Sequence, residues 1–207
     1  MDEKWHCFLY HMAFSSRICI AIYRRYSMRQ EEFYTQALQE YQKKGLHFIL
    51  ASIIIWGAVF GIHLSSLPIL TKNLYTFFCS APLVPLAFLI SKLIGVDFQN
   101  KGDPLSNLGL LFALNQMLYI LIAMWVYAAV PDKMLMVYAM IFGAHLLPYG
   151  WLYQSQAYYF FSIVIPFTVL LIGLFFTAAA IVALMLVIEI IFAICLVIEY
   201  KSIRKSA

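Results

Sequence analysis

The sequence predicts an all-α protein, an integral membrane bundle of about six transmembrane helices. The 207-residue chain is 64% hydrophobic and 12% charged, whereas a soluble domain carries about 45–50% apolar and about 25% charged residues. Its apolar residues form continuous runs, several of which reach the roughly 20 residues that a helix needs to cross a bilayer. A membrane β-barrel would instead alternate apolar and polar residues along each strand. We therefore expect the lipid bilayer to surround most of the chain.

The region before the apolar runs divides into two parts. Residues 1–27 mix charged, histidine and aromatic side chains with an apolar stretch too short to span. We interpret them as an atypical extension, an upstream read-through ahead of a natural start at Met28. Residues 28–45 are predicted to form an amphipathic helix, cytoplasmic or interfacial, because apolar residues such as Phe33 and Ala37 fall on one face.

Six apolar runs define a transmembrane domain at residues 46–200, followed by a cytoplasmic tail at 201–207. Their lengths are close to that of one bilayer crossing. The linkers between them are short and leave no room for a second soluble domain. The expected runs are 46–67, 74–94, 108–127, 134–153, 158–176 and 181–200.

The positions of lysine and arginine predict the orientation. With the N-terminus inside, only Lys72 and Lys133 fall on the outer side, which is the bias that the positive-inside rule describes. We therefore expect a multi-pass protein of the plasma membrane with both termini in the cytoplasm. The residues expected on the cytoplasmic side are Arg29, Lys43, Lys44, Lys92, Lys101, Lys201, Arg204 and Lys205.

An internal similarity indicates two inverted halves. FGIHLSSLP at 60–68 resembles FGAHLLP at 142–148, and YTFFCS at 75–80 resembles YYFFSI at 158–163. A repeat of three spans enters the membrane from the opposite side in its second copy, as in many transporters. We therefore predict an inverted repeat, although the third spans of the two halves show no obvious match.

Polar residues inside the apolar runs are the candidate site for a solute or ion. Glu189 lies near the middle of the sixth run, where a charge costs roughly 2.5–3.5 kcal/mol on insertion scales. We expect His145 to be its partner, because histidine exchanges protons near neutral pH. The remaining candidates lie inside a run or one turn from His145, and they are His63, Asn115, Gln116 and Tyr149.

The same residues also have structural interpretations. A protonated Glu189 can act as a clasp by hydrogen bonding to another helix, and the histidines can close helix contacts beside Gly61 and Gly143. Gly57 and Gly61 form a GxxxG pattern, which is typical of close helix packing in lipid. A homodimer through this pattern is therefore one of the interpretations that stay open.

The sequence shows no motif of an enzyme or of a metal site. Nucleophile-elbow, zinc-protease, phosphate-loop and dinucleotide motifs are missing, and the four cysteines lack zinc-ligand spacing. The net charge of +4 is spread over the ends of the runs and forms no nucleic-acid patch. We expect no catalytic residue, metal, cofactor or nucleic-acid partner. A lipid-modifying enzyme is the third and weakest hypothesis, because no nucleophile–base pair is visible.

Three stretches resemble a family of small multi-pass bacterial membrane proteins of unknown function. They are the stretch at 41–68, from YQKKGLHFILASIIIWG through FGIHLSSLP, then MWVYAAVPDKM at 124–134 and IFGAHLLPYGWLY at 141–153. The resemblance covers residues 28 to about 200 and implies a bacterial inner-membrane location. It implies no activity.

Two functional hypotheses follow. The first is a transporter or channel for a small solute or ion, with an intramembrane Glu/His site between inverted halves. The alternative is a non-transporting membrane partner, such as a sensor, assembly factor or immunity factor. The amphipathic helix favours this alternative.

Overall fold

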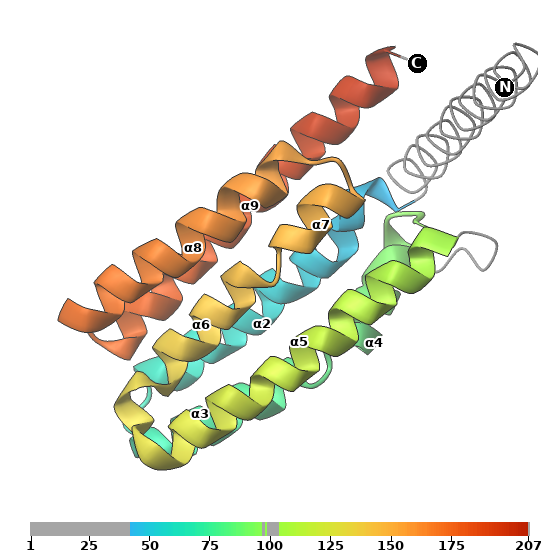
Figure 1. The fold of residues 1–207 in the computed structure, drawn as a ribbon. Coiled ribbons are helices and arrows are strands. Elements are labelled where there is room, and N and C mark those ends of the chain that lie inside the picture. The colour runs from blue at the N-terminus through green and yellow to red at the C-terminus, as the bar shows by residue number, and fades with distance from the viewer. Residues whose placement is uncertain (1–41, 97, 99–103, 207) are drawn as a thin grey trace, which may run out of the picture.

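The computed structural model describes residues 42–96, 98 and 104–206, and every element in this part of the chain is helical (Figure 1). The all-α prediction is therefore confirmed. The expectations for residues 1–27, and for the amphipathic helix before residue 42, lie outside the described residues. The elements are η1 (Lys43–Gly45), α2 (Leu46–Leu64), α3 (Ile69–Ser80), α4 (Leu83–Leu93), α5 (Pro104–Ala129), η2 (Pro131–Lys133), α6 (Met134–Ala144), α7 (Leu147–Leu152), α8 (Gln156–Phe175) and α9 (Ala178–Ser206).

Four helical segments of the described chain are long and apolar enough to cross a membrane. They are Lys43–Leu64, Pro131–Leu152, Gln156–Phe175 and Ala178–Ser202. A fifth arises if α3 and α4, which meet at a bend of 43°, form one span. The expected run at 108–127 falls in α5, whose described apolar part, Leu114–Ala129, is shorter than a span. Four helical segments, or five with the α3–α4 pair, are thus long and apolar enough to cross a membrane. The expected six spans stay a prediction.

The helices are arranged in two rows of three. In one row α2 packs between α9 and the α3–α4 pair, and in the other α6 packs between α8 and α5 (Figure 1). Contacts between α8 and α9 join the rows at one edge. Between the rows, Trp56 of α2 meets Phe142 of α6 with ring centroids 5.9 Å apart. The apolar core therefore lies mainly among α2, α6, α8 and α9.

Prolines accompany two of the helix breaks. Pro82 lies between α3 and α4, and Pro148 lies in the first turn of α7, just after α6 ends. Proline suits a first turn because its missing N–H would have no partner there. Pro166 lies inside α8 without ending that helix. A proline in an apolar run therefore did not by itself predict where a helix breaks.

The two copies of the FGxHL motif have different surroundings. Residues 60–64 close α2, whereas residues 142–146 cross the break between α6 and α7. A Cβ on Gly143 would lie 2.6 Å from Ile165, so this glycine allows α6 to pack closely on α8. A Cβ on Gly61 would meet no heavy atom of the described chain within 4 Å. The motif therefore does not confirm the repeat.

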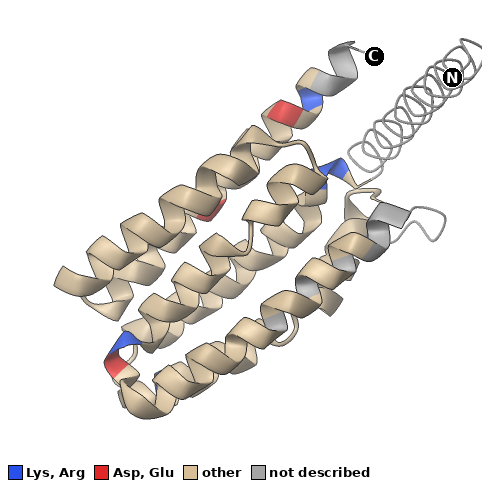
Figure 2. Cartoon of the chain, in the orientation of Figure 1, with Lys and Arg blue, Asp and Glu red and all other residues tan. Residues whose placement is uncertain are grey.

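Apart from Glu189 within α9, the charged side chains of the described chain gather at the two ends of the bundle (Figure 2). The start of α2 and the end of α9 share one end, where Lys44 Nζ donates to Glu199 Oε2. Lys72 and Lys133 belong to the other end, where Lys72 Nζ donates to the carbonyl of His63, the next-to-last residue of α2. The described lysines used to predict the orientation are therefore separated as the positive-inside rule requires. Which end faces the cytoplasm stays a prediction.

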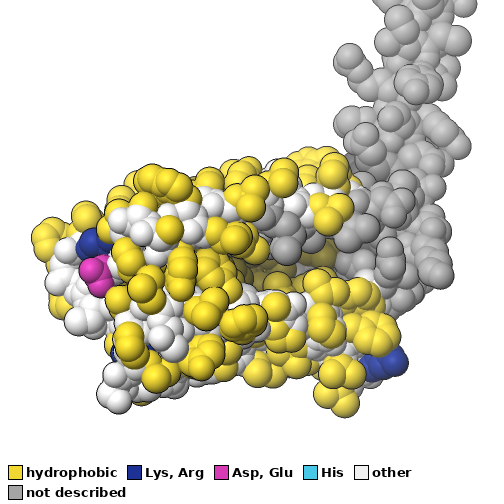
Figure 3. Space-filling view, turned by 90° about the horizontal axis from the view of Figure 1, so that it is seen from below, with side chains coloured by type: hydrophobic (Ala, Val, Ile, Leu, Met, Phe, Trp, Pro, Cys, Tyr) yellow, Lys and Arg dark blue, Asp and Glu magenta, His cyan; other side chains and the backbone are white. Residues whose placement is uncertain are grey.

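The surface between the two ends is apolar. Figure 3 shows a face made largely of hydrophobic side chains. Leu118 and Trp125 of α5 are 63% and 68% exposed, and Phe167 of α8 is 66% exposed. Apolar exposure over so much of a helical surface is what lipid contact requires.

Candidate functional site

Glu189 lies in the core because of its helical spacing. It shares one face of α9 with Met185, Phe192 and Leu196, residues three or four positions apart that are all fully buried. Glu189 itself is 0% exposed. The residue falls near the middle of Ala178–Ser202, a segment long and apolar enough to cross a bilayer, and buried apolar side chains lie on the same face of the helix.

Ser52 of α2 is the polar partner of Glu189. The Ser52 hydroxyl hydrogen-bonds to Glu189 Oε2 and also lies 2.8 Å from the carbonyl oxygen of Ile49. Ser52 is on the same buried face of α2 as Ile49, Trp56 and Val59. The other carboxyl oxygen, Oε1, has no hydrogen-bond partner within the described part of the chain. The carboxyl thus has one polar contact and one unpaired oxygen.

His145 has other partners than the expected Glu189. It follows α6 at the break before α7, and its Nδ1 hydrogen-bonds to the carbonyl oxygen of Phe142. Its ring stands edge-on to Tyr149, with centroids 5.9 Å apart. No hydrogen bond of the described residues joins His145 to Glu189. The expected pairing was wrong because sequence spacing does not say which neighbouring helix faces Glu189 at its depth.

His63 lies at the end of the bundle opposite the end that holds Lys44 and Glu199. It is buried near the end of α2, and its Nε2 lies 3.2 Å from Thr76 Oγ1 of α3. Lys72 Nζ donates to the His63 carbonyl at 3.2 Å. The contacts of His63 therefore join α2 to α3, and its part in a transport route stays a prediction.

The other candidates are not joined into one polar track. Asn115 of α5 is exposed and donates to the Tyr119 hydroxyl at 3.2 Å, and Gln116 is half-buried. Tyr149 of α7 donates from its hydroxyl to the Gly109 carbonyl at 3.3 Å. Of the six candidates, only His145 and Tyr149 are in contact with each other among the described residues, through their rings.

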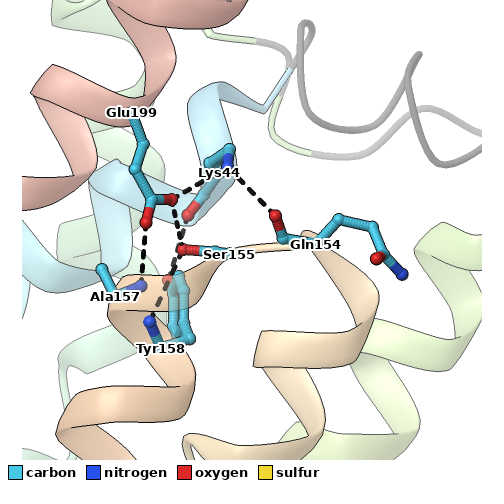
Figure 4. Close-up of polar contacts among 6 residues, drawn as sticks. All are labelled: Lys44, Gln154, Ser155, Ala157, Tyr158 and Glu199. Carbon is cyan, nitrogen blue, oxygen red and sulfur yellow. Dashed lines mark hydrogen bonds and ion pairs between the residues drawn. The ribbon is translucent and has the colours of Figure 1, made fainter.

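A second polar network joins three segments at the end where α2 begins (Figure 4). Lys44 Nζ lies 2.9 Å from Glu199 Oε2 and 3.3 Å from the Gln154 carbonyl oxygen. Glu199 also accepts from Ser155 Oγ at 2.6 Å and from the backbone N–H of Ala157 at 2.8 Å. The side chains of Lys44 and Glu199 are 4% and 23% exposed. Glu199 thereby links α9 to the start of α2 and to the first turn of α8.

The backbone of this network is left-handed at Lys44, Gly45 and Gln154. Their φ angles are 53°, 71° and 45°, and this region costs a residue with a Cβ about 1–2 kcal/mol. A Cβ at Gly45 would lie 2.9 Å from side-chain atoms of both Tyr153 and Tyr158. Such a conformation persists only where surrounding contacts hold it, so the network fixes how the chain enters α2.

Sequence reasoning missed Ser52 and the Lys44–Glu199 pair. Ser52 had a weak signal, because it is the one hydroxyl within the apolar stretch FILASIII at 48–55. The ion pair had none, because its members are 155 positions apart. No three His, Cys, Asp or Glu side chains of the described residues are grouped to hold a metal ion. The expectation of no metal stays a prediction.

Comparison with known proteins gives one family. The model of a family described as "Family of unknown function (DUF7010)" matches residues 32–199. No curated protein and no solved structure matches the chain. The matched range contains every candidate residue of the sequence analysis, Ser52, and the Lys44–Glu199 pair.

Proposed function

The chain belongs to this family of unknown function, DUF7010, and from its structure we propose a multi-pass membrane carrier or channel for a small solute or ion. In this proposal Glu189 binds the ion that is moved, or the ion that drives the movement. Ser52 orients the carboxyl from the facing helix. His145 and Tyr149, beside the break between α6 and α7, belong to a part of the route that Glu189 does not contact.

One observation carries the proposal: Glu189 is fully buried near the middle of a span and keeps one carboxyl oxygen unpaired among the described residues. An ionisable group at that depth is expensive. Helix packing alone would be served as well by an apolar residue of similar size. A carboxyl with a free acceptor oxygen is suited to bind an ion.

The arrangement of the helices supports inverted halves. The first half would be α2, the α3–α4 pair and α5, and the second the α6–α7 pair, α8 and α9. The first helix of each half packs against the second helix of its own half and the third helix of the other: α2 against α3–α4 and α9, and α6 against α8 and α5. A pseudo-two-fold axis in the membrane plane would generate these pairings, whereas the packing of α8 on α9 has no comparable counterpart between α3–α4 and α5. Transporters place their sites near such axes.

The test is flux through the purified protein in proteoliposomes. Proton movement is followed with a pH-sensitive dye. Movement of each of a panel of monovalent cations is measured separately, under an imposed membrane potential. The isosteric E189Q variant is compared with D132N, the same carboxyl-to-amide change at exposed Asp132 of η2. We expect wild-type protein and D132N to give flux above that of protein-free liposomes. In E189Q this additional flux should be at least tenfold lower.

Two results count against the proposal. If wild-type protein gives no flux above protein-free liposomes for any ion of the panel, the carrier function is rejected. If E189Q carries flux at the wild-type rate, Glu189 is not the ion-binding group, and the proposal loses the observation on which it stands. Circular dichroism of each variant in the same lipid checks that it has folded.

A further inference from the structure

The hydrogen bonds around Ser52 demand more protons than Ser52 has. Its hydroxyl contacts two oxygens, the Ile49 carbonyl and Glu189 Oε2. A serine hydroxyl carries one hydrogen and can also accept. The Ile49 carbonyl can only accept, so it takes the Ser52 hydrogen at 2.8 Å. The contact between Ser52 and Glu189 is then satisfied only if the hydrogen in it comes from Glu189.

The surroundings of Glu189 support the same assignment. A buried carboxylate anion needs a cation or several donors, and Glu189 Oε1 receives no hydrogen bond from any described residue. A neutral carboxyl needs only one acceptor for its hydrogen, and Ser52 supplies it. Its remaining oxygen is then an uncharged carbonyl oxygen, which costs far less to bury unpaired than half of an anion.

Ionisable residues on the helices around α9 do not supply the missing charge. On the α2 side, Lys44 is bound to Glu199 and His63 lies against Thr76 of α3. On the α8 side, the Tyr158 hydroxyl donates to the Lys44 carbonyl at 3.0 Å. After α6, His145 is bound to Phe142. His47 and Tyr138 have ring contacts with Phe98 and Trp56. None of these ionisable side chains hydrogen-bonds to Glu189 among the described residues.

We propose that the ion held at Glu189 is a proton, carried as a neutral carboxylic acid that donates to Ser52 while Ser52 donates to the Ile49 carbonyl. This inference rests on the proposed function in taking Glu189 as the ion-binding group. It narrows the ion class to the proton, against sodium or another metal cation, because a metal cation would need the carboxylate anion and further oxygen ligands.

Infrared spectroscopy of the full-length protein in lipid nanodiscs at neutral pH tests the inference. A protonated carboxyl has a carbonyl band of its own, which moves when H₂O is exchanged for D₂O. We expect such a band at the high-wavenumber side of its range, since Oε1 accepts no hydrogen bond. The band should disappear in E189Q, remain in D132N, and shift in S52A, which removes the acceptor but keeps the carboxyl.

E189Q should fold, because its amide N–H can donate to Ser52 as the acid does. If it does not fold, the S52A shift alone assigns the band to Glu189. The inference is overturned if no D₂O-sensitive carboxylic acid band depends on Glu189 or Ser52. The outcomes separate it from the proposed function. A band without Glu189-dependent flux removes the carrier and leaves the bound proton, whereas Glu189-dependent flux without the band leaves the carrier and replaces the proton by another ion.

Discussion

Lys44 and Glu199 differ in the hydrogen bonds and solvent exposure that each keeps when its partner is replaced. E199Q leaves the Lys44 ammonium, 4% exposed, without its anion and with the Gln154 carbonyl as its remaining hydrogen-bond acceptor in this network. K44M leaves Glu199 23% exposed and still bound to Ser155 and Ala157. We expect E199Q to lower the free energy of unfolding by about 3 kcal/mol, as for an uncompensated buried charge. K44M should cost about 1 kcal/mol or less, as for a partly exposed pair.

Unfolding of both variants in mixed micelles, followed by circular dichroism along a denaturant titration, measures this difference. K201M is the matched control for K44M, because Lys201 is exposed and its replacement should change the free energy by less than about 0.5 kcal/mol. Equal losses for K44M and E199Q would contradict the expectation that the buried Lys44 depends more on its partner than the partly exposed Glu199 does.

For single residues, the sequence predicted how deep a side chain lies along its helix, but not which side chain of another helix it contacts. The sixth apolar run placed Glu189 near mid-bilayer, and the structure places it near the middle of the α9 span. Its partner could not be read in the same way. His145 and Ser52 are both polar residues inside apolar runs, and the choice depends on the rotation of α2 and α6 about their own axes relative to α9. One sequence contains little information on those rotations when lipid and core faces are equally apolar.

At the scale of a helix, two glycines from the same repeated motif give opposite expectations. G143A would push a methyl group into Ile165 and Pro166 of α8, at 2.6 Å and 2.7 Å. We expect it to destabilise the protein by about 1–3 kcal/mol, as overpacking does. G61A would meet no described neighbour within 4 Å and should leave the stability of the monomer within about 0.5 kcal/mol of wild type. The measurement is again unfolding in mixed micelles.

The G61A variant also tests the homodimer interpretation of the GxxxG pattern. If G61A destabilises the protein as much as G143A, the open face of α2 is covered in the membrane by something other than lipid. Chemical crosslinking in liposomes of wild type and of a bulkier G61L variant then asks whether a second copy is what covers it. An unchanged G143A variant would contradict the close packing of α6 on α8.

The helices themselves were largely predictable, and their breaks were not. The expected runs at 158–176 and 181–200 correspond to α8 and α9, because an apolar stretch in lipid must close its own backbone hydrogen bonds and has little choice but to be helical. The run at 134–153 contains Pro148, but this proline did not show that the run would divide after Ala144 into α6 and α7. Pro148 and Pro166 look alike in sequence, yet only Pro148 lies beside a break, since tertiary packing decides whether a kinked helix continues.

At the scale of the whole molecule, the bundle is long enough for its two ends to lie on opposite sides of a membrane. The 19 residues of α2 extend about 28 Å at about 1.5 Å per residue, which matches the roughly 30 Å hydrocarbon core. Lys44 lies just before this helix and is bound to Glu199 near the end of α9. Lys72 lies beyond its other end, bound to His63. The distribution of lysines then predicts which side is which.

Cysteine labelling in intact cells tests that prediction. In a background without the native cysteines, one new cysteine replaces exposed Asp132 in η2 and another replaces exposed Lys201 near the end of α9. With both termini in the cytoplasm, a membrane-impermeant maleimide should label D132C in intact cells, and K201C only after the cells are permeabilised. The two positions control for each other, because each is exposed and lies at an end of the same bundle. Labelling of K201C but not D132C in intact cells would mean that the protein has the opposite orientation in the membrane. Labelling of both positions in intact cells would mean that the two ends of the bundle face the same side of the membrane. That result would contradict the carrier function, which needs a protein that spans the bilayer.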